Sequence, residues 1–348
     1  MKILVTGNLG YVGSVLTPHL RSLGHDVYGL DTGYYKECRL LETEDVPTVN
    51  ADVRSVTAAD LQGFDAVIHL AALSNDPMGE IDPALTDEIN HLGSVRLAEL
   101  AREAGVPRFA LASSCSMYGV GGGDAALDER AAFNPQSAYA RSKVDAESGI
   151  SALATEDFSP TFLRFATAYG LSPRLRFDLV TNNLTGWAFT TGMIKIMSDG
   201  TPWRPLVHVR DMSHAFATVV EAPRELVHNQ AFNVGRNEDN YQIKDIASVV
   251  EKVVPNSTVE YAGQAGGDTR TYRVSFNKIR QTLPNFQPQW SLEPGVAELY
   301  EAFSRLGLSQ AAFQSKDFTR LEQLKYLMAQ GQLDGTLRWN VAASTPGA

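Results

Sequence analysis

The sequence predicts an α/β fold, with a doubly wound parallel sheet and a smaller C-terminal lobe that binds the substrate. Two observations predict this fold. Short apolar runs alternate with helical patterns through the first half of the 348 residues, and a glycine-rich turn directly follows the first run. Parallel strands need crossover connections, so strands that alternate with helices indicate a parallel sheet.

The apolar patterns place the individual elements. Runs of four to seven apolar residues are typical of buried strands, whereas apolar residues at threes and fours indicate helices. Strands are expected at residues 2–5, 27–30, 65–70, 108–112 and 160–165, and helices over residues 11–23, 84–104 and 138–154.

After Phe165 the alternation loosens, which indicates a second structural unit. The runs at residues 205–209 and 231–234 are expected to return to the main sheet. An amphipathic stretch over residues 318–328 is interpreted as a packing face without chemistry. The predicted organisation is a first domain over residues 1–165 with returning segments near 205–234, a smaller lobe mainly over 166–310, and a C-terminal helix and tail over 311–348.

Composition limits the possible functions. The formal charge of −10 argues against nucleic-acid binding, which needs a basic surface, although a few arginines can still form a pocket for a small anion. Only Cys38 and Cys115 are present, so a disulfide framework is not expected and a reducing compartment fits. The sequence shows neither a signal-peptide pattern nor a run of about 18 apolar residues, and metal ligands are not predicted. A cytoplasmic protein without a membrane partner is expected.

The segment TGNLGYVG, with Gly7, Gly10 and Gly13, lies between the first strand and the first helix. Glycine permits the tight turn and the close approach of the backbone to a pyrophosphate, which the helix N-terminus also attracts. Asp31 ends the second strand, where a carboxylate would bind the ribose hydroxyls and repel a 2′-phosphate, so a Rossmann-type site for NAD is predicted. The predicted cofactor-binding residues are Gly7, Gly10, Tyr11, Val12, Gly13, Asp31, Asp52, Val53, Leu70, Ala71, Ala72, Asn90, Tyr139 and Lys143.

Two of the polar residues near this site admit a second interpretation. Asp52 lies where the third strand ends, so it can meet the adenine or cap the helix that follows. His69 lies inside a predicted buried strand, where a core histidine with satisfied hydrogen bonds is expected rather than a catalyst. The small residues Ala71 and Ala72 would let the chain pass beneath the cofactor.

Tyr139 and Lys143 are four residues apart on a predicted helix, so their side chains project from one face. A phenol has a reference pKa of about 10, and a neighbouring ammonium group lowers it. Such a tyrosine can take a proton from a sugar hydroxyl while hydride leaves the same carbon for NAD. Ser113 and Ser114 follow the strand at residues 108–112, where a hydroxyl can bridge the tyrosine and the substrate.

The order TGNLGYVG, Asp31, HLAA, SSCSMYG and YARSK resembles the extended short-chain dehydrogenases/reductases that modify nucleotide-sugars. This is the NAD-dependent epimerase/dehydratase family, which includes the UDP-galactose 4-epimerase-like enzymes. The resemblance covers roughly residues 1–305 and leaves out the tail. It implies that Ser114, Tyr139 and Lys143 are catalytic, and that Asn90 matches a recurring active-site asparagine that can equally be structural.

The resemblance extends to the second lobe, where it implies contacts to a nucleotide diphosphate. Asn183 and Arg204 match residues that bind the diphosphate, with Asp211 closing the motif, and a guanidinium suits this ligand because it donates two parallel hydrogen bonds. The family's further phosphate-binding arginine is absent, since residues 264–266 read QAG; Arg270, Arg273, Arg174 or Arg176 can compensate or can be ordinary surface residues. The predicted substrate-binding residues are Ser74, Ser114, Cys115, Ser116, Thr167, Arg176, Asn183, Arg204 and Arg270.

The residues after Ser114 discriminate among the family's reactions. Dehydratases and decarboxylases of this family carry carboxylates there, whereas this chain has Cys115 and Ser116, which favours 4-epimerisation through a transient 4-keto-sugar. Thr167 replaces an asparagine of the epimerases, so the sugar contacts differ. The alternatives are a nucleotide-sugar reductase, a C3/C5 epimerase that uses Cys115 as acid and base, or a 4,6-dehydratase. For Cys115 itself, a small buried residue is the simpler interpretation.

An NAD-binding regulator without turnover is the alternative from a different class, and the intact Tyr139–Lys143 pair argues against it. A homodimer is expected, since the helices at residues 84–104 and 138–154 pair with their copies in many relatives. Leu92, Val95, Leu97 and Leu100 fit such an interface, although packing on the sheet explains several of them too.

Overall fold

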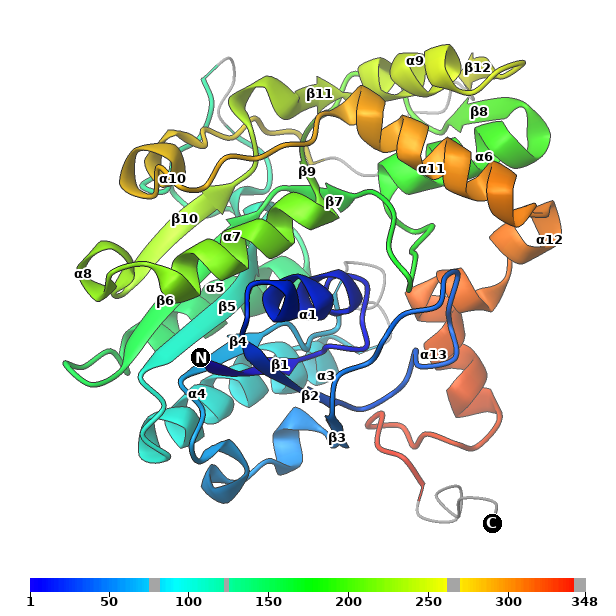
Figure 1. The fold of residues 1–348 in the computed structure, drawn as a ribbon. Helices are drawn as coiled ribbons and strands as arrows, with labels where there is room; N and C mark the ends of the chain where they lie inside the picture. Colours follow the sequence, from blue (N-terminus) through cyan, green and yellow to red (C-terminus); the bar gives the residue numbers. More distant parts are fainter. Residues whose placement is uncertain (75–81, 122–124, 262–269, 341–348) are drawn as a thin grey trace.

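The computed structural model describes residues 1–74, 82–121, 125–261 and 270–340, and its centre is a sheet of seven parallel strands (Figure 1). The strand order is β10-β6-β5-β4-β1-β2-β3, which reverses direction at β1 as a doubly wound sheet does. The predicted α/β fold class is therefore confirmed. The strands are β1 (Lys2–Thr6), β2 (Asp26–Asp31), β3 (Thr48–Asn50), β4 (Ala66–His69), β5 (Arg108–Ser114), β6 (Ser159–Phe165) and β10 (Gln230–Val234).

Helices cover both faces of this sheet, as Figure 1 shows. On one face α1 (Gly13–Ser22) and α7 (Val209–Glu221) pack against Ile3 and Val5. On the other face α4 (Gly93–Glu103) and α5 (Ala138–Ser151) pack against Leu4. Neighbouring residues of β1 thus enter opposite cores, because side chains alternate along a strand. This explains why β1 is a continuous apolar run.

The predicted helix over residues 84–104 is present but irregular. It consists of α3 (Pro83–Asp87), a π-helical segment (Glu88–Leu92) and α4, which follow one another without a break. Asp82 begins it, because its carboxylate accepts a hydrogen bond from the backbone N–H of Ala84. The π-helical segment carries Asn90, and such segments are frequent at functional sites.

The second lobe lies beyond the carboxyl ends of the main strands. It contains a sheet of β7 (Thr167–Tyr169), β9 (Trp203–His208) and β11 (Asn240–Gln242), and a pair formed by β8 (Met193–Ile196) and β12 (Thr258–Tyr261). Its helices are α6 (Val180–Thr191), α9 (Ile243–Val253) and α11 (Leu292–Leu306). The short α8 (Arg224–Val227) and α10 (Asn277–Thr282) pack against the main sheet instead, with Val227 and Ile279 in the same core as Phe232 of β10.

One strand prediction was wrong. Residues 205–209 were expected in the main sheet, but β9 pairs with β7 and β11 instead, and only residues 230–234 return as β10. Leu206 of β9 packs against Ile246 of α9, inside the core of the second lobe. An apolar run indicates a buried strand but not the sheet that it joins. The predicted division into domains stays a prediction.

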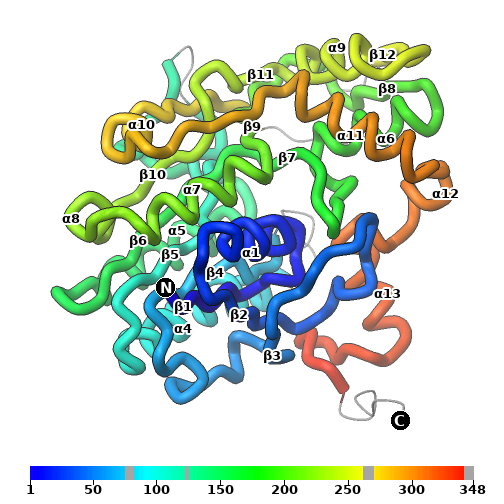
Figure 2. Tube along the Cα trace, in the orientation of Figure 1, coloured from blue at the N-terminus to red at the C-terminus, as the bar shows by residue number. Residues whose placement is uncertain are grey.

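The C-terminal segment, defined here as residues 309–340, folds back to the first domain. It contains α12 (Gln310–Phe313), α13 (Arg320–Ala329) and a bridge between Leu333 and Trp339. Figure 2 shows it beside the stretch that connects β2 and β3. Leu324 and Leu327 of α13 pack in one cluster with Leu73, so the prediction of an apolar packing face fits part of this helix. None of the helices in the described part of the chain combines the length and apolar character that crossing a membrane requires.

Candidate active site

A cavity of about 420 Å³ opens where the carboxyl ends of the main strands face the second lobe. In doubly wound sheets, ligands bind in such crevices at the point where the strand order reverses. All of the residues predicted for the site line this cavity except Asn90, Cys115 and Asn183. The structure therefore brings together residues that are up to 263 positions apart, from Gly7 to Arg270.

The glycine turn forms the floor of the cavity between β1 and α1. Gly7 has φ +73°, a conformation that residues with a side chain rarely adopt, and a Cβ on Gly13 would lie 2.4 Å from the carbonyl oxygen of Gly7. Asp31 fixes the other side of the turn by accepting hydrogen bonds from the backbone N–H groups of Leu9 (3.0 Å) and Gly33 (2.8 Å). A concave backbone of this kind, free of side chains at the start of a helix, fits the pyrophosphate of NAD.

Asp31 is buried at the end of β2, where burial raises the pKa of its carboxyl and the two backbone hydrogen bonds oppose that rise. Asp52 also lines the cavity, but its carboxylate is engaged: it accepts hydrogen bonds from the backbone N–H (2.8 Å) and the guanidinium (2.6 Å) of Arg54. The capping interpretation of Asp52 thus has a structural basis. Its contact with the adenine stays a prediction.

Tyr139 and Lys143 project from one face of α5 into the cavity. The helix begins at Ser137, whose hydroxyl accepts a hydrogen bond from the backbone N–H of Ala140. The Lys143 ammonium donates to the Ala112 carbonyl at the end of β5 (2.8 Å) and lies 5.8 Å from the centre of the Tyr139 ring. Burial of the ammonium lowers the pKa of Lys143 to about 8.

Ser114 ends β5 and lines the cavity, and Ser116 follows it in the turn Cys115–Tyr118. The Ser114 hydroxyl accepts a hydrogen bond from the backbone N–H of Ser116 at 3.1 Å, which fixes its oxygen. The Ser116 hydroxyl is buried and has no hydrogen-bond partner among the described residues. Thr167 of β7 adds a third hydroxyl to the cavity lining.

Cys115 lies outside the cavity. Its thiol is fully buried and donates to the Arg164 carbonyl at 3.1 Å. Burial raises the pKa of this thiol well above its usual range. The nearby guanidinium of Arg164 is already paired with Glu147 at 2.7 Å, inside the core. A neutral, enclosed thiol is neither a base nor a group that a sugar can reach.

Asn90 and Asn183 also lie outside the cavity wall, and both side chains bind backbone. The Asn90 amide oxygen accepts from the N–H of Leu73 (2.8 Å), and its nitrogen donates to the Leu73 carbonyl (3.0 Å) and the Ser142 hydroxyl (3.2 Å). This side chain therefore ties α5 to the chain that follows β4. Asn183 donates to the Phe177 carbonyl at 2.8 Å.

Arginines enter the cavity from the second lobe. Arg176 donates to the Ser74 hydroxyl (3.0 Å) and forms a two-bond ion pair with Asp178 (2.9 and 3.0 Å). Arg204 donates to the Trp203 carbonyl (2.8 Å) and to the Arg270 carbonyl. Arg174 is buried outside the cavity, and residues 264–266, where the family's further arginine is missing, lie outside the described residues.

Several residues that line the cavity were not predicted from the sequence. Tyr34 and Tyr35 follow β2, Asp178 and Tyr272 come from the second lobe, and Arg320 begins α13. Of these residues, Arg320 could have been noticed in the sequence. It places a charge within the apolar pattern of residues 318–328, which was interpreted as a packing face. The aromatic residues carry no comparable signal, since they resemble core residues in the sequence.

His69 is confirmed as a core histidine. Its Nδ1 lies 2.6 Å from the Thr6 hydroxyl and its Nε2 lies 2.8 Å from the Ser94 hydroxyl. Burial lowers the pKa of the imidazole to about 3. The folded protein therefore keeps His69 neutral at a pH at which the unfolded chain takes up a proton.

This difference predicts acid sensitivity. An unfolded histidine has a pKa of about 6.5, so His69 favours unfolding increasingly as the pH falls from about 6.5 towards 3, by about 1.4 kcal/mol per pH unit. Urea titrations between pH 7 and pH 5 should show this slope in the free energy of unfolding. In His69→Gln, which keeps a polar side chain, the slope should be smaller by about 1.4 kcal/mol per pH unit. An unchanged slope would contradict the assignment of His69 as a buried, neutral histidine.

Comparisons with known proteins agree with this geometry. The model of the family described as "NAD dependent epimerase/dehydratase family" matches residues 3–235. The chain is 30% identical to a UDP-glucose 4-epimerase of Mycolicibacterium smegmatis, over 87% of this chain and 98% of that protein. It is 25% identical to a UDP-glucuronate 4-epimerase of Thermodesulfobacterium geofontis, over 84% and 93%.

Among solved structures, MoeE5 in complex with UDP-glucose and NAD has a TM-score of 0.76 and 28% identity, over 88% of this chain and 99% of MoeE5. The predicted Rossmann-type fold and the predicted resemblance are thereby confirmed, as is the assignment to NAD-dependent enzymes of nucleotide-sugars. The family model and the full-length relative lead to one conclusion: this chain belongs to the NAD dependent epimerase/dehydratase family.

Proposed function

We propose that this protein is a nucleotide-sugar 4-epimerase, which inverts C4 of a UDP-sugar through a transient 4-keto-sugar. The observation that carries the proposal is that Tyr139 and Lys143 line the same cavity as the glycine turn. The relatives named UDP-glucose 4-epimerase and UDP-glucuronate 4-epimerase support the choice of reaction and of UDP.

The side chains of the cavity suit each part of this reaction. The Tyr139 phenolate takes the proton of the C4 hydroxyl, and the buried Lys143 ammonium stabilises that phenolate. The Ser114 hydroxyl hydrogen-bonds to the oxygen that becomes the ketone. NAD, when bound, accepts the C4 hydride and returns it. Arg204 and Arg270 hold the diphosphate, so that the keto-sugar can turn and present its other face to the same groups.

The other reactions of the family find less support. Dehydration needs an acid beside the sugar, yet the carboxylates among the described cavity residues are Asp31 and Asp52, beside the cofactor's adenosine end, and Asp178, which is paired with Arg176. Epimerisation at C3 or C5 through Cys115 needs an accessible thiolate, and this thiol is enclosed.

Cys115 therefore gives a test between two reactions. Replacing it by serine should leave kcat within about threefold, because the thiol does not reach the sugar, although the smaller hydroxyl fills this buried site less well and lowers stability by about 1 kcal/mol. Steady-state assays and thermal unfolding measure the two effects separately. A loss of activity above a hundredfold with an unchanged fold would favour the C3/C5 reaction.

Incubation with a panel of UDP-sugars in deuterated water tests the proposed reaction. NMR should show a 4-epimer without deuterium in the sugar ring and without consumption of added NADH. Deuterium at C3 or C5 would contradict simple 4-epimerisation, and a requirement for stoichiometric NADH would identify a reductase. Failure to turn over any nucleotide-sugar, together with tight NAD binding, would favour a regulator.

We also infer a cytoplasmic homodimer. The two cysteines are free and buried, which fits a reducing compartment. Leu97 packs on the sheet, but Leu92 is 53% exposed beside α4 and is available to a second copy. Light scattering of the purified protein should give a mass of two chains, and the mass of one chain would contradict the dimer.

A further inference from the structure

The C-terminal segment, residues 309–340, is bound to the stretch that follows β2 by contacts at several points along its length. The Trp339 indole donates to the Thr32 carbonyl at 2.6 Å, and the Tyr34 hydroxyl donates to the Leu337 carbonyl. Tyr34 also lines the cavity. The segment therefore fixes a part of the cavity wall next to Asp31, although it lies outside the family resemblance of the sequence.

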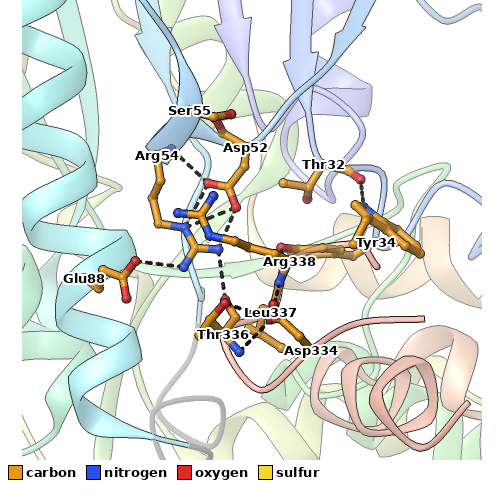
Figure 3. Close-up of polar contacts among 11 residues, drawn as sticks. Thr32, Tyr34, Asp52, Arg54, Ser55, Glu88, Asp334, Thr336, Leu337 and Arg338 are labelled. Atoms are coloured by element: carbon orange, nitrogen blue, oxygen red, sulfur yellow. Dashed lines mark hydrogen bonds and ion pairs between the residues drawn. The ribbon is translucent and has the colours of Figure 1, made fainter. Parts of the chain in front are cut away.

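A charged cluster anchors the same segment next to Asp52 (Figure 3). The Arg54 guanidinium donates to Asp52 (2.6 Å), to Glu88 (3.0 Å) and to the Thr336 carbonyl (2.9 Å), so a single side chain joins three parts of the fold. Figure 3 shows the Arg338 side chain reaching towards Asp52 and Arg54, and its charge helps to lower the pKa of the Asp52 carboxyl. The segment thus meets the end of the cavity assigned to the cofactor.

Arg320, the first residue of α13, is the charged side chain of this segment that enters the cavity wall. It is 2% exposed, its guanidinium carbon lies 4.2 Å from the centre of the Tyr35 ring, and Nη2 donates to the Arg174 carbonyl at 3.0 Å. Nη1 has no hydrogen-bond partner among the described residues. A buried guanidinium with a free N–H group is costly unless a ligand completes its hydrogen bonds.

Within the described part of the chain, Arg320 lacks the ion pair that each of its two buried arginine neighbours has. Three buried guanidinium groups, of Arg174, Arg176 and Arg320, lie in this region. Asp178 pairs with Arg176 at 2.9 Å, and the partly exposed Asp45 lies 3.4 Å from Arg174, whereas Arg320 has no ion pair among the described residues. Burial raises the pKa of the Asp31 carboxyl, and the charge of Arg320 opposes that rise, so Asp31 is a third carboxylate of this region. An anionic ligand would stabilise a buried guanidinium that has neither an ion pair nor a full set of hydrogen bonds.

We propose that Arg320 is a cofactor-binding residue, whose free Nη1 binds the pyrophosphate of the dinucleotide, and that the C-terminal segment completes the NAD site. The glycine turn supplies backbone N–H groups to this anion from one side, and Arg320 supplies a guanidinium from the other. The inference rests on the dinucleotide site and not on the sugar reaction, so failure of the 4-epimerase proposal would leave it standing.

The test compares ligands with and without the pyrophosphate. Affinities for ADP-ribose and for adenosine are measured by calorimetry on nucleotide-free wild-type protein, on Arg320→Gln, and on Lys325→Gln as control. Lys325 lies on the same helix and is exposed, so this variant removes an equal charge outside the cavity. Arg320→Gln should lower the affinity for ADP-ribose about 10- to 100-fold and change the affinity for adenosine less than twofold. Lys325→Gln should change neither affinity.

If Arg320→Gln lowers the affinity for both ligands equally, Arg320 only supports Tyr35 in the cavity wall. If the affinity for ADP-ribose is unchanged, Arg320 does not contact the anion. Either result overturns the proposal. If the glutamine variant does not fold, Arg320→Lys takes its place. Lysine keeps the charge but lacks the forked donor groups of the guanidinium. The affinity for ADP-ribose should therefore fall about two- to tenfold, and the affinity for adenosine should not change. Any other pattern contradicts the assignment of Arg320.

Discussion

Tyr139→Phe should lower kcat for the preferred nucleotide-sugar by at least about a thousandfold and leave NAD bound. The variant removes one oxygen, so the helix α5, the Lys143 contact with Ala112 and the ring position should persist. A proton-transfer group in the transition state typically contributes 10²- to 10⁴-fold, and here hydride cannot leave C4 unless the proton leaves its hydroxyl. Initial rates measure the effect, and NAD released by acid from the purified variant gives the occupancy.

Tyr326→Phe is the matched control, because Tyr326 is 42% exposed on α13 and is not among the residues that line the cavity. It loses the same atom and should keep wild-type rates. If Tyr139→Phe turns over within tenfold of the wild type and the control is unaffected, Tyr139 is not the base of the proposed reaction. A loss of both turnover and bound NAD would instead mean that the phenol has a structural role.

Gly13→Ala should remove the cofactor altogether. A Cβ at this position would lie 2.4 Å from the Gly7 carbonyl oxygen and 2.5 Å from the Asn8 Cα, and backbone atoms cannot move aside as a flexible side chain can. The turn must then open, which separates the N-terminus of α1 from the pyrophosphate. The purified variant should contain less than about a tenth of the wild-type NAD, and it should lose more than about 2 kcal/mol of unfolding free energy.

Gly335→Ala is its control, since a Cβ on Gly335 has no neighbour within 4 Å. This variant should bind NAD as the wild type does and unfold at a similar denaturant concentration. If Gly13→Ala retains the full NAD content, the glycine turn cannot be the cradle of the pyrophosphate, and the assignment of the dinucleotide site fails.

The sequence predicted the main sheet well because its signals are local. The run KILV, the glycine turn and the acid at Asp31 lie within one unit of strand, helix and strand, and each reflects a backbone requirement at its own position. His69 was likewise interpreted correctly, since a polar residue inside an apolar strand is buried and must be satisfied there.

The remaining errors concern contacts between distant segments. The run at residues 205–209 indicates a strand, but its partner β11 lies more than thirty residues further along the chain, and nothing local specifies that pairing. Cys115 follows Ser114 directly, yet its thiol lies in the core, because Ser114 is extended and neighbouring side chains of an extended chain face opposite sides. Arg320 reaches the cavity only because α13 folds back on the first domain.

The central claim is that one hydride leaves C4 of the sugar and returns to the same carbon while Tyr139 moves the proton. A UDP-sugar deuterated at C4, converted in ordinary water with no added cofactor, tests this claim most directly. The account predicts that the C4 epimer keeps its deuterium at C4 in full, as mass spectrometry and NMR would show. Deuterium lost to solvent, or found at another carbon, would contradict it.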